Sequence, residues 1–97
     1  MNEITVIARV KAKVGKEKEL ERQWLAAVDS SRKEVGCVEY VLHRSLEDPA
    51  LFVSVEKWVS KEANEKHMQS AHIQELLQQV PHLVAVPPEI LPFEVVS

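Results

Sequence analysis

The chain has 97 residues, of which 45% are hydrophobic and 28% are charged, and its formal net charge is −3 at pH 7. This balance is typical of one folded domain over residues 1–97, and it excludes a disordered chain and a strongly basic nucleic-acid-binding protein. No apolar run approaches the ~20 residues of a membrane span, and the single cysteine, Cys37, excludes an intrachain disulfide. Residues 1–4 show neither the basic nor the apolar region of a secretory signal, so we expect none. We therefore expect a cytoplasmic protein without membrane or nucleic-acid partners.

The first two elements are predicted by their hydrophobic periods. Residues 3–14 alternate between two faces, which predicts a β-strand that ends at Gly15. Residues 16–35 repeat apolar side chains at the spacing of one helical face, which predicts an amphipathic helix. Gly36 follows this helix, and we expect it to adopt the left-handed conformation that commonly ends helices.

A β-hairpin is predicted next, from residues 37–45 and 51–59, because the turn formers Asp48 and Pro49 lie between them. Both strands carry apolar residues on both faces, whereas a sheet with one face in water alternates more cleanly. One layer of helices cannot cover both faces of a sheet. We therefore expect a homodimer in which two sheets pack face to face.

Two helices and a last strand complete the chain. Ser60 and Ser70 are the predicted N-caps of the helices, the first running to about residue 68, and Pro81 is expected to stop the second. Residues 89–96 predict a strand, and Pro92 favours a place at the sheet edge, because proline has no N–H to donate to a neighbouring strand. The order β-α-β-β-α-β predicts a ferredoxin-like α+β fold, with a four-stranded antiparallel sheet and helices on one face. Two such sheets together would form a dimeric α/β barrel.

Three motifs stand in a particular order. They are Gly36-Cys37 at the start of the second strand, Glu56-x-Trp58 at the end of the third, and two histidines, His67 and His72, across the helical break. In this order and spacing they resemble the antibiotic biosynthesis monooxygenase family of dimeric α/β-barrel proteins. The resemblance implies oxidation of hydroquinones or polyketide phenols by molecular oxygen without metal or flavin. Relatives on the same fold degrade haem or isomerise lactones, so the fold alone does not fix the reaction.

On this resemblance we expect a cofactor-independent monooxygenase whose partners are a small aromatic substrate, molecular oxygen and a second copy of the chain. The substrate would be a hydroquinone or a phenolic, polyketide-like aromatic. Two alternatives stay open. One is an isomerase or lyase of a small oxygenated metabolite, which would shift a proton without oxygen. The other is a dimeric ligand-binding stress-response module without catalysis.

The histidines are the candidate proton acceptors. A neutral imidazole can take a phenolic proton near neutral pH, and we assign this catalytic role to His67, with His72 as a substrate contact. The alternative is structural, with one histidine capping a helix and the other packing against Trp58. Two histidines without a fixed carboxylate partner do not make a metal site, so we expect no metal and no other cofactor.

The remaining candidates come from the strands. Glu56 shares a strand face with Phe52 and Trp58, because alternate residues of a strand point the same way. We expect Glu56 to orient the catalytic histidine, and the two aromatic residues to wall the substrate pocket. Tyr40 is expected to face the same cavity, with Val38 beside it, and to donate a hydrogen bond to a substrate oxygen.

Overall fold

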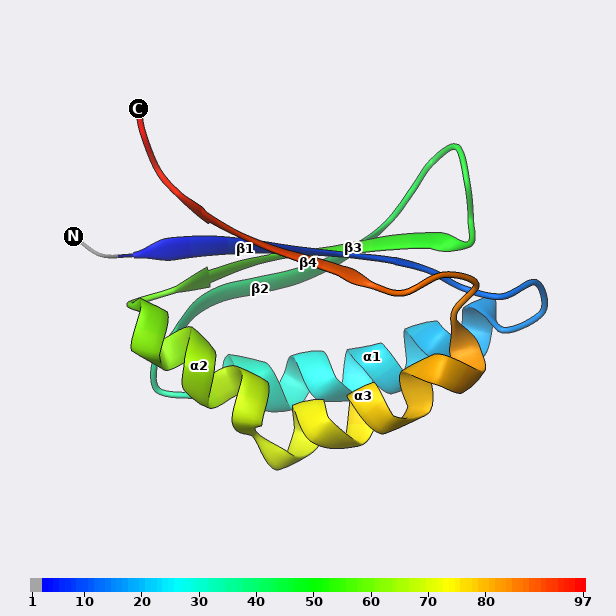
Figure 1. The fold of residues 1–97 in the computed structure, drawn as a ribbon, viewed down its shortest axis with the longest axis horizontal. Helices are drawn as coiled ribbons and strands as arrows, with labels where there is room; N and C mark the ends of the chain where they lie inside the picture. The colour runs from blue at the N-terminus through cyan, green and yellow to red at the C-terminus, as the bar shows by residue number, and fades with distance from the viewer. Residues whose placement is uncertain (1–2) are drawn as a thin grey trace.

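The computed structural model describes residues 3–97; of the domain expected over residues 1–97, residues 1 and 2 lie outside this part. Its elements, in chain order, are β1 Ile4–Lys11, α1 Glu17–Arg32, β2 Cys37–Arg44, β3 Leu51–Trp58, α2 Lys61–Gln69, α3 Ala71–Leu83 and β4 Glu89–Glu94. The strands form an antiparallel sheet in the order β2-β3-β1-β4, and the helices cover one face of it (Figure 1). The predicted ferredoxin-like α+β fold is confirmed, with β4 at the sheet edge as Pro92 indicated.

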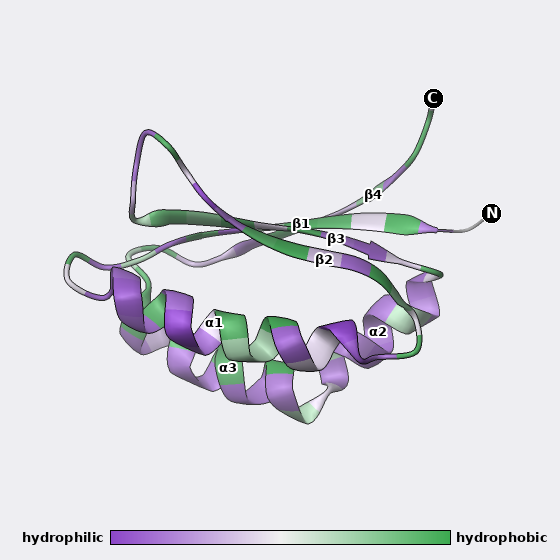
Figure 2. Cartoon of the chain, turned by 180° about the vertical axis from the view of Figure 1, so that it is seen from behind, coloured by the Kyte–Doolittle hydropathy of each residue, from purple (hydrophilic) through white to green (hydrophobic). Residues whose placement is uncertain are grey.

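The core lies between the helices and the covered face of the sheet. Alternate residues of β1 and β3 point into it, and the apolar face of α1 packs against them (Figure 2). The most deeply buried apolar side chains are those of Val6, Leu20, Phe52 and Trp58. Burying a large apolar side chain stabilises the fold by about 1.5–3 kcal/mol, so this layer supplies the rigid support for any site built on it.

The opposite face of the sheet has no helical cover (Figure 1). The strand register aligns Leu91, Ile7, Val55 and Val41 in one row across all four strands on this face. The β2–β3 loop and the C-terminal end of the chain rise on the same side (Figure 1). This uncovered apolar row accounts for the two-sided strands of the sequence, and the homodimer that would cover it stays a prediction.

Gly36 does not adopt the left-handed conformation expected of it, and that prediction is wrong. Among residues 3–97 the positive backbone angle falls at Gly15, whose φ is 87°. Gly36 instead lies where α2 crosses the start of β2, and a Cβ atom built on it would come 2.4 Å from the Cβ of Ala63. The glycine is needed for close approach of two elements rather than for the turn itself.

Pro81 does not stop α3, which continues to Leu83. Backbone contacts hold this last turn against the end of β1, with the Lys13 N–H donating to the Leu83 carbonyl at 2.8 Å. Leu83 and Val84 are both buried there. Tertiary packing therefore outweighs the hydrogen bond that proline cannot donate within the helix.

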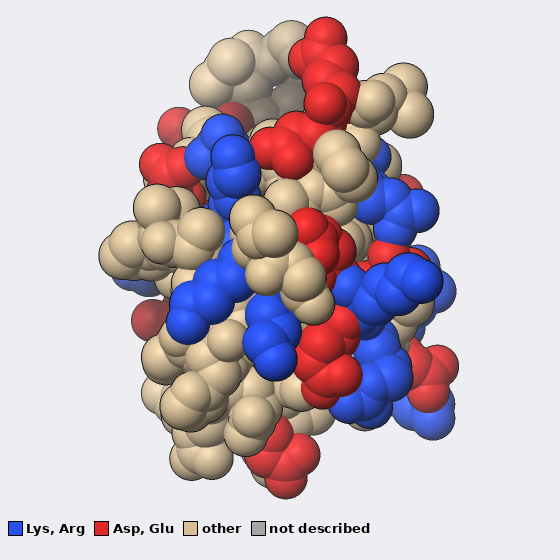
Figure 3. Space-filling view, turned by 90° about the vertical axis from the view of Figure 1, so that its right-hand side faces the viewer, with Lys and Arg blue, Asp and Glu red and all other residues tan. Residues whose placement is uncertain are grey.

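Two surface properties bear on the expected class of protein. In the part of the chain that the structure describes, no helix combines the length and apolar character needed to span a bilayer. On the face seen in Figure 3, acidic and basic side chains are interspersed and form no uniformly basic area. A nucleic-acid footprint would require such an area.

Candidate functional site

His67 is brought to the sheet by α2. Ser60 caps this helix as predicted, because its hydroxyl oxygen accepts a hydrogen bond from the Ala63 N–H at 3.1 Å. His67 lies about two turns further on, and its side chain returns toward the sheet, where the residue is 2% exposed. Its ring packs on the indole of Trp58, with ring centroids 4.3 Å apart. The imidazole ring of His67 is thus packed against the indole of Trp58 on the side that faces the sheet.

A carboxylate links the two histidines. Glu34 lies two positions past the end of α1, and its Oε2 lies 2.8 Å from His67 Nδ1 and 2.8 Å from His72 Nε2. Ser70, between α2 and α3, places its hydroxyl 3.2 Å from the same nitrogen of His72. The segment after α1 and the junction between α2 and α3 therefore meet at one carboxylate oxygen.

Glu56 is buried without a cationic partner at hydrogen-bond distance. The Ser54 hydroxyl donates to its Oε2 at 2.6 Å, and the Trp58 indole N–H donates to its Oε1 at 3.1 Å. His67 Nε2 lies 3.8 Å from Oε1, which is too long for a hydrogen bond. The residue that contacts the imidazole directly is thus Glu34, and not Glu56 as the sequence suggested, although Glu56 faces the other ring nitrogen.

Tyr40 faces the covered side of the sheet and is 3% exposed. Its hydroxyl oxygen accepts a hydrogen bond from the Trp24 indole N–H at 3.0 Å. Burial, together with the nearby Glu56 carboxylate, raises the pKa of Tyr40 well above its usual range, so the hydroxyl keeps its proton. The expected companion Val38 is instead 51% exposed, because the register between β2 and β3 shifts between Cys37 and Glu39.

A small cavity lies between the sheet and the helices. It has a volume of about 50 Å³ and borders Tyr40, Glu56 and His67 on one side. Its other walls are apolar and come from α1, α3 and β4, including Trp24, Leu76, Leu77 and Ile90. A pocket that holds a drug-sized ligand usually has roughly 300–1,000 Å³, so an aromatic substrate requires this cavity to widen.

Phe52 does not line this cavity. Its ring is buried near the opposite end of β3, where the Arg44 guanidinium carbon lies 6.0 Å from the ring centroid. Trp58 does not line the cavity either, but it contacts three residues that do: His67, Glu56 and, edge-on, Tyr40. The structure therefore brings Tyr40 and Glu56 together with His67 at the cavity, and it leaves Phe52 apart.

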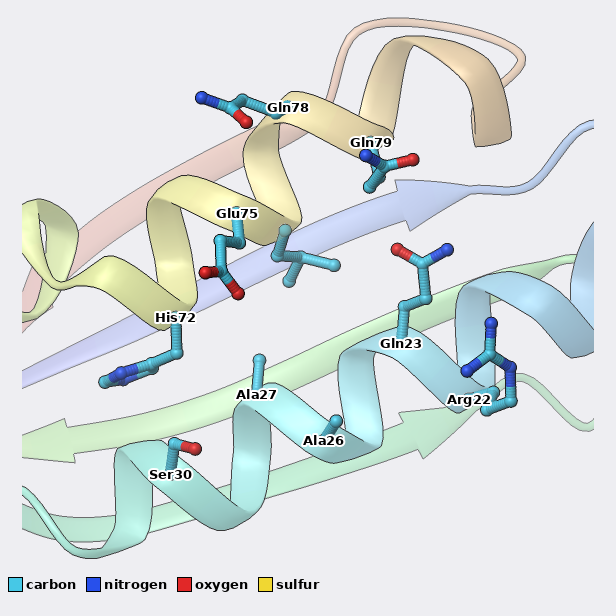
Figure 4. A pocket seen from close by; sticks show the side chains of 10 residues that line it. Arg22, Gln23, Ala26, Ala27, Ser30, His72, Glu75, Gln78 and Gln79 are labelled. Carbon is cyan, nitrogen blue, oxygen red and sulfur yellow. The ribbon is translucent and has the colours of Figure 1, made fainter.

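His72 lies where the site reaches the protein surface. It lines one end of a groove between α1 and α3, with Ser30 and Ala27 on the facing helix (Figure 4). The groove has a volume of about 430 Å³ and is lined largely by polar side chains. His72 itself is partly exposed, with 24% of its side chain accessible. Through Glu34, this surface histidine connects to the buried one.

Cys37 lies near Glu34 and Glu56, in surroundings that disfavour its thiolate. Burial raises the pKa of its thiol, and the carboxylates of Glu34 and Glu56 raise it further. The thiolate that a nucleophilic cysteine needs is therefore disfavoured, in agreement with the sequence, which places no basic neighbour beside it.

Sequence reasoning missed Glu34, Trp24 and Ser54. Glu34 belongs to no hydrophobic pattern, and only its place beside Gly36-Cys37 could have drawn attention to it. Trp24 belongs to the apolar face of the first helix, but no spacing rule connects it to Tyr40 across 16 positions. Ser54 shares the covered face of β3 with Glu56, which was the available signal for their contact.

Comparison with known proteins gives concordant matches. The family model described as antibiotic biosynthesis monooxygenase matches residues 3–79. The crystal structure of PA3566 from Pseudomonas aeruginosa matches with a TM-score of 0.93 at 30% identity, over 100% of this chain and 97% of that chain. "Putative monooxygenase YcnE" of Bacillus subtilis is 28% identical over 88 residues, which are 91% of this chain and 93% of that protein. "Uncharacterized protein sll1783" of Synechocystis is 29% identical over 87 residues, and the chain spans only 59% of its length.

Proposed function

Because the chain belongs to the antibiotic biosynthesis monooxygenase family, we propose that it oxidises a hydroquinone or a phenolic, polyketide-like aromatic with molecular oxygen and without a cofactor. The observation that carries this proposal is the placement of His67. One ring nitrogen contacts the Glu34 carboxylate at 2.8 Å, and the other faces Glu56 at the wall of the cavity. A buried imidazole held in this way is suited to accept a phenolic proton.

The Glu34 contact selects the tautomer of His67. A carboxylate only accepts hydrogen bonds, so Nδ1 carries the hydrogen and Nε2 keeps a free lone pair. That lone pair is the proton acceptor. When Nε2 takes the proton, the ring becomes a cation between two carboxylates, Glu34 at one nitrogen and Glu56 at the other. Their charges stabilise the imidazolium that forms.

The deprotonated ring then reacts with oxygen directly. An electron-rich phenolate passes one electron to oxygen, and the two radicals combine to a peroxide on a ring carbon. The proton held on His67 returns to this peroxide, and loss of water leaves a new carbonyl. A hydroquinone and oxygen thus give a hydroxyquinone and water, with one oxygen atom in each product and no external reductant.

The cavity supplies orientation and a dry environment. Tyr40 keeps its hydroxyl proton and can donate to a substrate oxygen, while the apolar walls exclude water from the radical pair. Widening of the cavity is easiest between α3 and β4, because every residue of β4 is exposed and the strand forms the edge of the sheet. Met68 lines the same cavity, and its flexible side chain can adapt to a ring.

We also propose that the active form is a homodimer joined through the uncovered face of the sheet. The row of Leu91, Ile7, Val55 and Val41 supports this, since a protein of this size gains from covering an apolar sheet face. The paired sheets would brace β3, which carries Glu56 and Trp58 on its other face. A stable interface of this kind usually buries more than ~1,200 Å² in total.

Oxygen labelling tests the proposed reaction. The protein is incubated with a panel of hydroquinones under ¹⁸O₂, and product and water are analysed by mass spectrometry. A monooxygenase places one labelled atom in the quinone and one in water, at a rate above uncatalysed autoxidation. Oxygen consumption at the background rate with every hydroquinone, or substrate isomerised without any label, would contradict the proposal.

A further inference from the structure

The carboxylate that the sequence did not supply for a metal site is present in the structure. Glu34, His67 and His72 each offer one ligand atom, and these three atoms lie within 4.8 Å of one another. We propose that this cluster, here called the His₂Glu cluster, binds a zinc-like divalent transition-metal ion. Two imidazole nitrogens and one carboxylate oxygen are ligands that such ions prefer, with water in the open position.

Three spacings decide how much must rearrange: those of the Glu34 oxygen from the two histidine nitrogens, and that between the two nitrogens, which is at most 4.8 Å. Ligands 2.0–2.1 Å from a tetrahedral ion lie about 3.3 Å from one another. The Glu34 oxygen now lies 2.8 Å from each histidine nitrogen, so it must move outward by only about half an ångström. Glu34 can make this move, because it lies past the end of α1 and its side chain is 19% exposed.

The surroundings bear on two further requirements of a metal site. Metal-bound histidines usually donate their second ring N–H to a carboxylate; Glu56 stands 3.8 Å from His67 Nε2, so it must shift slightly toward the ring to accept this hydrogen bond. An ion also needs an entry path. The side chain of His72 is 24% exposed and lines the groove between α1 and α3, which opens to solvent.

The ion would not serve oxygen chemistry in the cavity. Of the cluster, only His67 lines that cavity, whereas Glu34 and His72 do not. The imidazole ring of His67 therefore separates the ion from the substrate. An ion bound at Nδ1 leaves the hydrogen on Nε2, the nitrogen that would otherwise accept the phenolic proton. The ion is therefore expected to inhibit, and this consequence, unlike the binding itself, rests on the proposed function.

Cobalt binding tests the site without any assay of activity. Co²⁺ is titrated into protein freed of any affinity tag and treated with a chelator, and visible absorbance and calorimetry report binding. We expect one equivalent per chain, an absorbance typical of low coordination number, and displacement by Zn²⁺. Glu34→Gln and His72→Gln should abolish saturable binding, and Glu56→Gln should weaken it by roughly tenfold.

Matched controls come from histidines outside the cluster. His82 lies in the last turn of α3 and His43 on the uncovered sheet face, both exposed, and His82→Gln and His43→Gln should bind cobalt as the parent does. No saturable binding to the parent, or undiminished binding to a folded His72→Gln protein, would overturn the proposal. Cobalt binding through the cluster in a protein that oxidises no hydroquinone would leave the metal site standing and refute the proposed function.

Discussion

Glu34 Oε2 lies 2.8 Å from His67 Nδ1, although the two residues are 33 positions apart in the chain. The contact joins the segment after α1 to the last turn of α2, directly above the buried Trp58. In the proposed mechanism Nδ1 donates to this carboxylate, and the other nitrogen, at the wall of the cavity, is the proton acceptor. The proposed base is therefore held by packing on one side and by a carboxylate on the other.

Replacing Glu34 should slow the reaction more than it affects binding of substrate. Glu34→Gln keeps the shape of the side chain but removes the charge that stabilises the imidazolium, so we expect kcat to fall by roughly tenfold or more with little change in KM. Glu65→Gln is the matched control, because Glu65 is exposed on α2. Both are compared by oxygen uptake above autoxidation. Equal rates for Glu34→Gln and the parent would refute this role.

Tyr40 should resist ionisation as long as the protein is folded. It is the only tyrosine of the chain, so tyrosinate absorbance in the near ultraviolet reports on it alone. Because its pKa is raised in the folded state, the unfolded chain loses this proton first, near pH 10, and the folded state keeps it. Its contribution to stability is therefore complete below about pH 10 and is lost as the pH rises further.

The same tyrosine can be tested by substitution. Tyr40→Phe removes this group, so its free energy of unfolding should fall less steeply than that of the parent above pH 10. Urea unfolding of the two proteins at several alkaline pH values gives the comparison, and lysines cancel because both chains share them. Tyrosinate absorbance that rises near pH 10 while the far-ultraviolet circular dichroism stays native would show that Tyr40 is not shielded.

Gly36 should tolerate no side chain while Ala63 faces it. Gly36→Ala places a Cβ 2.4 Å from the Ala63 Cβ, and overpacking of this kind costs about 1–3 kcal/mol. Ala63→Gly removes the opposing atom, so the double variant should lose less stability than the sum of the two single losses. Urea unfolding of all four proteins measures this coupling. Strictly additive losses would show that the two residues do not clash.

The uncovered sheet face should hold two copies together. Val55 lies near the centre of the apolar row, and Val55→Lys places a charge there, so this variant should sediment as a monomer where the parent sediments as a dimer. Val14→Lys is the control, since Val14 is 97% exposed in the loop after β1. Sedimentation velocity at micromolar concentration distinguishes the two. A parent protein that sediments as a monomer would contradict the sheet-to-sheet interface.

Most of the fold could be predicted because its elements are encoded locally. The alternation of β1, the helical period of α1 and the cap at Ser60 each act within a few residues. The errors arose where contacts between segments distant in sequence determine the backbone conformation. Pro81 is kept in α3 by packing against the end of β1, and Gly36 is set by its approach to Ala63.

Some features of the candidate site also follow from local sequence patterns, and others depend on tertiary contacts. The shared strand face of Glu56 and Trp58 follows from strand geometry, and the spacing of His67 from Ser60 predicts its turn toward the sheet. The bridge through Glu34 depends on the tertiary path of the segment after α1, which no periodicity reports. The sequence predicts that Tyr40 faces the covered side of the sheet, as it does. It does not predict the bulge at Val38, because an extra strand residue leaves no clear pattern in the sequence.

Oxygen uptake by a His67→Gln protein tests the central claim most directly. Glutamine fills most of the space beside Trp58, which matters because the imidazole is 2% exposed and alanine would leave a cavity there. We predict at least a roughly tenfold slower oxidation of a hydroquinone that the parent oxidises, after subtraction of autoxidation, with an unchanged circular dichroism spectrum. If the folded His67→Gln protein consumes oxygen as fast as the parent, His67 is a packing residue and the proposed base lies elsewhere.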